Sequence, residues 1–170
     1  MRLLINGDDI TRLARPTTAD GASTARAVEE AQDLDIKPAI GVELFAALGE
    51  SSERMAALLD GCVYDTGCGK REHRGLLKAL AYYAYARLVK TSTMGRMTRY
   101  SLVQKENDWS THSDARDRQA AYNEAFAVAD RYMAGVLDYL RTNAATYPEF
   151  TACCGGGLRN NRLKINMIGR

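Results

Sequence analysis

A long amphipathic segment near the C-terminal end constrains the fold more than any other feature of this chain. From about Asp114 to Thr142, apolar residues recur every three or four positions and no proline interrupts them. This spacing predicts one helix of roughly 40 Å with a single apolar stripe. The stripe consists of Tyr122, Ala125, Phe126, Ala129, Met133, Val136, Leu137 and Leu140. A helix with one apolar face must bury it against other elements, so we expect a helical bundle.

Shorter helices are expected earlier in the chain. They are placed over about 6–15, 24–37, 38–48, 52–59 and 72–90. Asn6 is expected to cap the first helix, and Leu34 is expected on the apolar face of the second. The residue before a proline is biased out of the helical region, so the second helix should end at Ile36 or Lys37, and Pro38 opens the next one. The glycine-rich residues 61–71 read as a loop.

Two segments depart from the helical pattern. From Thr91 to Thr111 the periodicity is lost, and residues 97–103 have the β-branched and aromatic content of a short strand, with a turn at 107–108. After three glycines at 155–157, apolar and polar residues alternate in a basic tail, which is a strand pattern. We therefore predict a mainly α protein: a bundle domain of four to five helices over 1–150, a short β-like excursion at 91–111, and an extended, glycine-linked basic arm over 151–170.

The charge is distributed unevenly along the chain. The formal net charge is only +2, yet residues 1–60 carry 11 acidic and 6 basic side chains, whereas residues 61–170 carry 10 acidic and 17 basic ones. The net charge is therefore close to zero only because an acidic N-terminal part and a basic later part nearly cancel. No stretch approaches the roughly 20 apolar residues needed to span a bilayer, and the N-terminal residues leave no room for a signal peptide. We expect a cytosol-like compartment in which the four cysteines are reduced.

Metal binding is the first chemical possibility to weigh. Cys62, Cys68 and His73 are close in sequence, and Cys153 and Cys154 are adjacent near the arm. Thiolate and imidazole ligands would suit zinc. However, the five-residue gap between Cys62 and Cys68 exceeds the usual spacing, and adjacent cysteines are poor joint ligands. Free thiols are the favoured interpretation, and no metal or cofactor is expected.

Catalytic motifs are absent from the sequence. His112 lies in a polar stretch that is typical of the entry to the long helix, where a solvated or capping role is favoured. The carboxylate pairs 8–9 and 29–30 consist of neighbours, which point apart on a helix. The run 67–70 lacks the glycine spacing of a phosphate-binding loop. We therefore expect no enzyme and assign no catalytic or cofactor-binding residue.

A basic stretch is the strongest functional feature. Between His73 and Lys105 there is no acidic residue but seven basic ones: Arg74, Lys78, Arg87, Lys90, Arg96, Arg99 and Lys105. Some of these must simply be solvated. The stretch could contact nucleic-acid phosphates, or it could meet the acidic residues 1–60 of a neighbouring copy. The second interpretation is favoured because it accounts for both halves, since a head-to-tail contact of unlike faces can close into a ring.

The order of these segments resembles the head–tail connector proteins of tailed bacteriophages, also called adaptor or head-completion proteins. The resemblance is carried by residues 14–18, 25–48, 64–89, 101–114 and 139–150 and continues into the basic tail. Its most distinctive part is the run from Ala31 to Pro38, followed by Gly41. The resemblance implies a ring of commonly twelve copies under the portal, which joins capsid to tail at the neck of the virion. It also implies contacts with the portal protein, a tail or further connector protein, and the DNA that passes through the channel without sequence-specific recognition.

The resemblance and the charge pattern together predict which residues contact a partner. The arm is expected to contact a neighbouring subunit or the portal through Arg159, Arg162, Leu163, Lys164, Ile165, Met167 and Ile168. Residues facing another subunit or DNA are expected to be Arg87, Lys90, Arg96, Arg99 and Lys105. The projecting loop is represented by Tyr100 and Trp109. The alternative is a small helical DNA-binding or regulatory protein that uses the 73–105 basic stretch.

Overall fold

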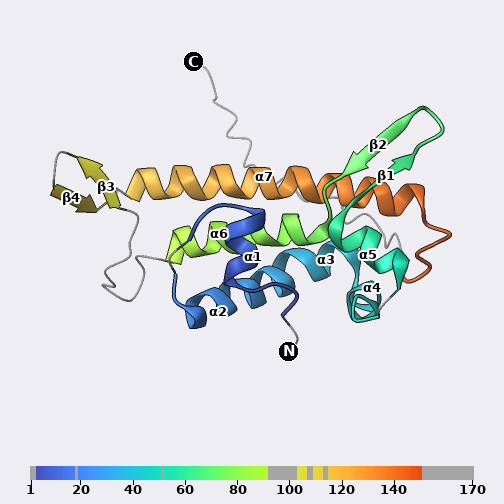
Figure 1. The fold of residues 1–170 in the computed structure, drawn as a ribbon, viewed down its shortest axis with the longest axis horizontal. Helices are drawn as coiled ribbons and strands as arrows, with labels where there is room; N and C mark the ends of the chain where they lie inside the picture. The colour runs from blue at the N-terminus through green and yellow to red at the C-terminus, as the bar shows by residue number, and fades with distance from the viewer. Residues whose placement is uncertain are drawn as a thin grey trace, which may run out of the picture.

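Helices make up most of the computed structural model, which describes residues 3–17, 19–50, 52–91, 103–106, 109–112 and 115–150 (Figure 1). The mainly α class with a short β excursion is confirmed. The helical elements are α1 (Gly7–Leu13), α2 (Gly21–Ala31), the π-helical turn η1 (Gln32–Ile36), α3 (Lys37–Ile40), α4 (Val42–Ala47), α5 (Glu53–Asp60), α6 (Leu76–Thr91) and α7 (Ala115–Thr142). The strands are β1 (Cys62–Asp65), β2 (Lys70–His73), β3 (Val103–Glu106) and β4 (Trp109–His112).

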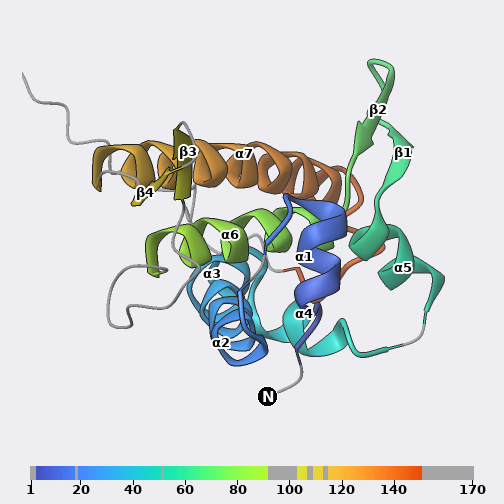
Figure 2. The same cartoon turned by 60° about the vertical axis from the view of Figure 1, so that its left-hand side comes forward.

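Helix α6 forms the middle layer of the molecule. Figures 1 and 2 show α7 on one side of it, α2 and α3 on the other, and α1 beside it. Side chains from all around α6 are therefore buried: Leu76, Ala79, Leu80, Ala81, Tyr83, Ala84, Ala86, Leu88 and Val89. A helix that is apolar on most sides belongs in the centre of a bundle, and the alanines allow its neighbours to approach closely.

Capping side chains fix where the first two helices begin. Asn6 accepts a hydrogen bond from the Asp9 N–H, and the Asp9 carboxylate accepts one from the Asn6 N–H, which completes a capping box. The expected cap of α1 is thus confirmed. Asp20 caps α2 through the Ser23 N–H, so α2 begins at Gly21, three residues before the expected start at Thr24.

The expected helix break before Pro38 is wrong. The Lys37 N–H bonds to the Gln32 carbonyl, five residues back, so the chain passes through the π-helical turn η1 and continues into α3. The wider turn relieves the clash that a proline ring makes with the carbonyl four residues before it. The turn contains one residue more than an ordinary helical turn. This extra residue changes which side chain faces the core, and Ile36 is buried. Leu34, expected on the buried face, is instead 65% exposed.

The helix expected over 38–48 is divided in two. Gly41 has φ +89°, a conformation that a glycine adopts readily, and it separates α3 from α4. The segment nevertheless buries Ile40, Leu44 and Leu48 in the core. This division, together with the short α1 and α5, gives the described residues more helical segments than the four or five expected.

The loop expected over residues 61–71 is a β-hairpin. Strands β1 and β2 pair antiparallel from Cys62 opposite His73 to Asp65 opposite Lys70. The Thr66 N–H and hydroxyl both donate to the Gly69 carbonyl and close the turn. Strand β2 occupies the residues expected to start the next helix, so α6 begins at Leu76 rather than near Glu72. The glycines that indicated a loop are the residues that permit the tight turn and the close packing at its base.

Two glycines form the base of this hairpin. Gly61 and Gly75 have φ of +97° and +84°. A Cβ atom on Gly61 would lie 2.4 Å from the His73 carbonyl oxygen, and one on Gly75 would lie 2.2 Å from the Leu59 carbonyl oxygen. The chain entering β1 and the chain leaving β2 therefore cross in backbone contact.

The described strands of the β excursion lie at the end of the expected range 91–111. β3 and β4 pair antiparallel from Val103 opposite His112 to Glu106 opposite Trp109. His112, expected at the entry to the long helix, is therefore a strand residue. Residues 92–102, which include most of the expected strand at 97–103, and the expected turn at 107–108 lie outside the described residues.

The expected long helix is confirmed as α7, and its continuation was not foreseen. After Thr142 the chain folds back along α5, where Tyr147 is fully buried. The Tyr147 hydroxyl donates to the Arg54 carbonyl at 2.6 Å, and Arg54 forms an ion pair with Glu149 at 2.7 Å. These contacts make residues 143–150 part of the bundle. The predicted arm, 151–170, lies outside the described residues. Within the described part of the chain, no helix is both long and apolar enough to cross a membrane.

We predict that Gly75→Ala lowers the free energy of unfolding by about 2 kcal/mol or more, because the added methyl group meets backbone that side-chain rotation cannot move. Gly67→Ala is the matched control, since Gly67 also has positive φ (+74°) but no atom lies within 4 Å of its added Cβ. It should cost only about 1 kcal/mol. Urea unfolding of both variants measures the difference, and equal losses would contradict the steric role of Gly75.

Candidate functional site

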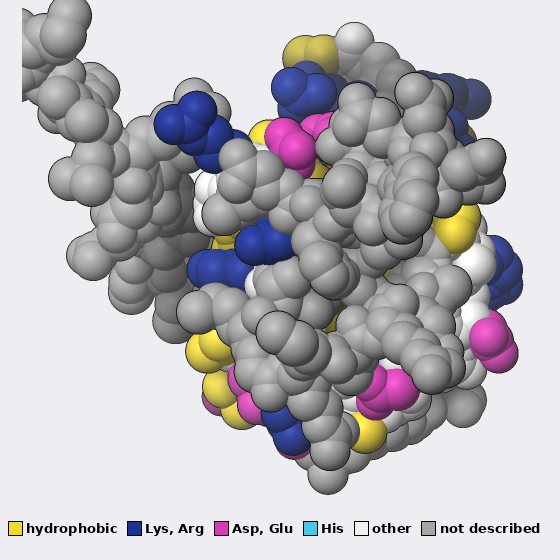
Figure 3. Space-filling model, turned by 90° about the vertical axis from the view of Figure 1, so that its left-hand side faces the viewer, with side chains coloured by type: hydrophobic (Ala, Val, Ile, Leu, Met, Phe, Trp, Pro, Cys, Tyr) yellow, Lys and Arg dark blue, Asp and Glu magenta, His cyan; other side chains and the backbone are white. Residues whose placement is uncertain are grey.

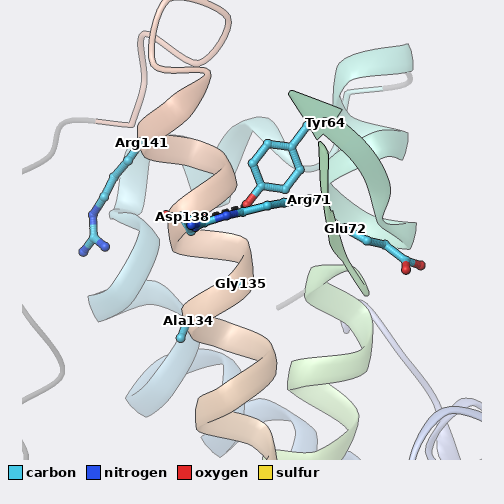
Figure 4. Close-up of a pocket in the computed structure, with 7 residues that line it drawn as sticks. All are labelled: Tyr64, Arg71, Glu72, Ala134, Gly135, Asp138 and Arg141. Carbon is cyan, nitrogen blue, oxygen red and sulfur yellow. Dashed lines mark hydrogen bonds and ion pairs between the residues drawn. The ribbon is translucent and has the colours of Figure 1, made fainter. Parts of the chain in front are cut away.

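The β1–β2 hairpin projects beyond the helices and leans against the C-terminal half of α7 (Figures 1 and 2). An open hollow of about 490 Å³ lies between them. Its lining residues, drawn in Figure 4, are Tyr64, Arg71, Glu72, Ala134, Gly135, Asp138 and Arg141. The small Ala134 and Gly135 are the α7 residues that leave this space unfilled.

Asp138 on α7 anchors the hairpin to the helix (Figure 4). Its Oδ2 accepts a hydrogen bond from the Tyr64 hydroxyl at 2.8 Å and another from Arg71 Nη1 at 2.7 Å. These two donors lower the pKa of the Asp138 carboxyl. Burial, followed by the hydrogen bond to Asp138, raises the pKa of Tyr64 to about 12. One carboxylate thus fixes both strands of the hairpin.

A histidine and a thiol lie beneath the hairpin. His73 is 2% exposed and stacks on Tyr139 with ring centroids 4.3 Å apart. Its Nδ1 accepts a hydrogen bond from the Gly75 N–H at 3.3 Å, and its Nε2 lies 3.4 Å from the Cys62 sulfur. Because Nδ1 is an acceptor, the proton of the neutral ring is on Nε2 and points at the sulfur. Burial lowers the pKa of His73, which favours this neutral form.

This arrangement is unsuited to thiol catalysis. An activating histidine must take the proton of the thiol, and the Nε2 of His73 already carries one. Cys68, which is close in sequence to Cys62 and His73 and was weighed with them as a zinc ligand, is exposed in the hairpin turn. Over the described residues, no three His, Cys, Asp or Glu side chains gather closely enough to hold a metal ion. Cys153 and Cys154 lie outside the described residues.

Arg87, which was expected to face another subunit or DNA, lies largely inside the subunit. Arg87 Nη1 lies 2.6 Å from Asp35, and its Nε lies 3.8 Å from Glu30. The side chains of Arg87 and Asp35 are only 14% and 12% exposed. Burial raises the pKa of Asp35, and the nearby guanidinium opposes this shift. The ion pair connects α6 to η1, so this cation is already neutralised by the acidic part of its own chain.

The other predicted basic residues are scattered. Lys90 lies over the ring of Tyr122 at 4.9 Å and Lys78 over Tyr132 at 5.1 Å, so both follow the seam between α6 and α7. Lys90 remains exposed. Lys105 and Trp109 are placed in β3 and β4. Arg96, Arg99 and Tyr100 lie outside the described residues, as do the arm residues Arg159, Arg162, Leu163, Lys164, Ile165, Met167 and Ile168.

Exposed cations that the sequence reasoning missed lie on α7. Arg116, Arg131 and Arg141 are exposed on the side of α7 away from the core, with Ala120, Ala127 and Ala134 exposed between them. We call these six residues the α7 outward face. Their exposure could have been predicted from the helical period, because these positions lie on the side of the helix opposite its apolar stripe. These arginines do not belong to an acid-free run, because acidic and basic residues alternate along α7.

The opposite side of the bundle is acidic. Exposed carboxylates on α2, η1 and the segments that follow define an acidic surface made of Glu29, Asp33, Glu43, Glu50 and Glu53. Residues 20–60 carry nine acidic and three basic side chains, whereas residues 62–91 and 115–142 together carry six acidic and ten basic ones. In the end view of Figure 3, the visible Lys and Arg side chains lie mainly in the upper part, and acidic ones gather mainly in the lower part.

The comparisons with known proteins give one match. Residues 36–160 match the family described as "Family of unknown function (DUF6712)". The matched range begins at the end of η1 and covers α3 to α7 and the β1–β2 hairpin. No curated protein matches the chain, and no solved structure does.

We predict that Tyr64→Phe lowers the free energy of unfolding by about 1 kcal/mol, because it removes one hydrogen bond to Asp138 and leaves that carboxylate only partly satisfied. The double variant Tyr64→Phe with Asp138→Asn should cost less than the two single changes added together. A double-mutant cycle by urea unfolding measures this coupling. Strict additivity would mean that the two side chains do not stabilise each other.

We predict that unfolding free energy decreases as the pH falls below about 6.5, the pKa of an unperturbed histidine. The folded-state pKa of His73 is lowered by burial, so the unfolded chain binds the proton first and is favoured as the pH falls. His73→Gln should reduce this loss between pH 7 and pH 5, whereas His112→Gln should keep it. Urea unfolding at both pH values tests this, and an unchanged slope in His73→Gln would contradict the assignment.

Proposed function

We propose that this chain, which belongs to the DUF6712 family of unknown function, is a structural subunit that associates head to tail into a ring. We further propose that the ring is a head–tail connector of a tailed bacteriophage, located under the portal at the neck of the virion. In this proposal the chain is not an enzyme and uses no cofactor. Its partners are other copies of itself, the portal protein, a tail or further connector protein, and the DNA in the channel.

The observation that carries the proposal is the separation of charge across one folded subunit. Residues 20–60, which cover one side of α6, have a net charge of −6, whereas α6 together with the β1–β2 hairpin and α7 (residues 62–91 and 115–142) has a net charge of +4. Surfaces of opposite charge on opposite sides of one subunit favour a head-to-tail contact. Repeated head-to-tail contacts close into a ring when the rotation from one copy to the next divides a full circle. The phage assignment rests on the resemblance of the sequence segments to connector proteins.

The candidate site supports a structural role more than a catalytic one. The side chains of the hollow satisfy one another, with Tyr64 and Arg71 bound to Asp138. His73 is buried and holds its proton against Cys62. The predicted arm, residues 151–170, adds a basic segment with alternating apolar residues that suits docking on another protein.

The alternative, a small DNA-binding or regulatory protein, has less support than the connector proposal. Within the 73–105 stretch, Arg87 is paired with Asp35, and Arg74 lies 3.3 Å from Glu72. Lys78 and Lys90 lie over aromatic rings rather than standing free. A duplex-binding surface requires several unpaired cations on one face.

We predict that the chain is a stoichiometric component of phage particles made by the cells that encode it. Mass spectrometry of gradient-purified particles should detect it in multiple copies, and immunogold labelling should place it at the neck. Titration of the isolated chain with duplex DNA at about 50 and 200 mM salt tests the alternative, which requires tight binding that weakens about a thousandfold or more. Absence from the particles, or tight salt-sensitive binding by the isolated chain, would overturn the connector proposal.

A further inference from the structure

We infer that the contact between neighbouring subunits joins the α7 outward face and the adjoining hairpin of one copy to the acidic surface of the next. This inference rests on the proposed function, because it names the surfaces that would close the ring. The partner is a second copy of this chain. Both surfaces belong to described residues and can be altered separately.

The two surfaces lie on opposite sides of the same subunit. In Figure 1, α7 and the hairpin lie above α6, whereas α2, α3 and α4 lie below it. Figure 2, turned by 60°, keeps the same order of layers. One copy can therefore present both surfaces at once without one blocking the other, as a head-to-tail contact requires.

The α7 outward face is shaped for close contact. Ala120, Ala127 and Ala134 recur every seven residues and are exposed, so a neighbouring element can approach the helix backbone along most of its length. Arg131 and Arg141 extend on either side of Ala134. Beside them lies the hollow of about 490 Å³, which has room for side chains of a partner.

Pairing within the subunit leaves this face basic. Glu124 is held by Arg15 at 2.6 Å, and Asp138 is held by Arg71 at 2.7 Å. Two of the α7 carboxylates are thus already neutralised. No described carboxylate forms an ion pair with Arg131 or Arg141, whose guanidinium groups remain available for a carboxylate from outside.

The acidic surface carries exposed apolar side chains as well as carboxylates. Leu34 and Val42 are 65% and 71% exposed, and Glu43 is exposed beside Val42. The hairpin has a counterpart, since Val63 is 64% exposed on the strand face that points away from α7. Three of the four large apolar residues that the described chain exposes thus lie on the two surfaces. Apolar contacts surrounded by complementary charges are typical of protein–protein interfaces.

These features favour a protein partner over DNA for the same face. Phosphates accept hydrogen bonds from arginine as carboxylates do, but a phosphate backbone has no apolar side chain to match Val63, and it would be repelled by Asp117, which is exposed next to Arg116. Carboxylates form bidentate pairs with arginine, and the acidic surface offers several: of its five, only Asp33 and Glu50 form an ion pair with another described residue. The exposed residues on the two sides therefore complement each other in both charge and polarity.

Charge reversal tests the contact in full-length chains. We compare wild type, a basic-face variant (Arg131→Glu with Arg141→Glu), an acidic-face variant (Glu29→Lys with Glu43→Lys), and one chain carrying all four changes. Arg12→Glu is the control for a surface charge reversal, because Arg12 lies on α1, outside both surfaces. The readout is the amount of the chain per major capsid protein in purified particles, measured by mass spectrometry, with circular dichroism as the check that each variant folds.

We expect each two-residue variant to be incorporated about tenfold less than wild type, because like charges then face each other across the contact. The four-residue chain should recover to within about threefold, since its two surfaces are complementary again with the signs exchanged. Normal incorporation of either two-residue variant, or no recovery in the four-residue chain, would overturn this inference. A wild-type chain that is absent from particles would instead overturn the proposed function. If a reversed variant fails to fold, the corresponding glutamine variants replace it, and they must still reduce incorporation more than Arg12→Gln does.

Discussion

The burial of α6 around most of its circumference is the constraint on which the rest of the molecule depends. Nine of the sixteen residues of this helix are apolar and buried, so it leaves little surface for solvent. Other elements must therefore cover it, and its sides are covered by different parts of the sequence: α7 on one side, α2 and α3 on the other, and α1 alongside. Because the covering helices have different compositions, burying α6 also separates their charges, which places the acidic N-terminal third and the basic later part on opposite sides.

Helices could be predicted from this sequence wherever local chemistry agrees with the packing. The stripe of α7 runs from Tyr122 to Leu140, about five turns, and the Asn6 cap depends only on neighbouring residues, so both were predictable. The β1–β2 hairpin was not, because its glycines have the same composition in a loop and in a tight turn. What distinguishes the two is a backbone contact between Gly61 and Gly75, residues fourteen positions apart, and a local pattern does not contain that contact.

The candidate site was less predictable than the fold, for a related reason. An acid-free run along the chain measures charge along the sequence, whereas a surface depends on which side chains face outward. Arg87 belongs to the run but is neutralised by Asp35, which lies 52 positions earlier. Arg131 belongs to a segment of mixed charge and is nevertheless exposed. The asymmetry between the two halves of the chain survives as a property of the surface, although different residues provide it.

The π-helical turn η1 has a consequence for how sequences of this kind can change over time. It holds one residue more than an ordinary helical turn, and that residue sets the rotation of everything on either side of it. Deleting Asp33 or Leu34 would restore the ordinary helical register, yet it would bring back the clash at Pro38, move Asp35 away from Arg87 and rotate α3 by about 100° relative to α2. Substitutions within the turn alter one side chain, but a change in its length alters the angle between two layers. The number of residues in this turn should therefore be under stronger selection than their identity.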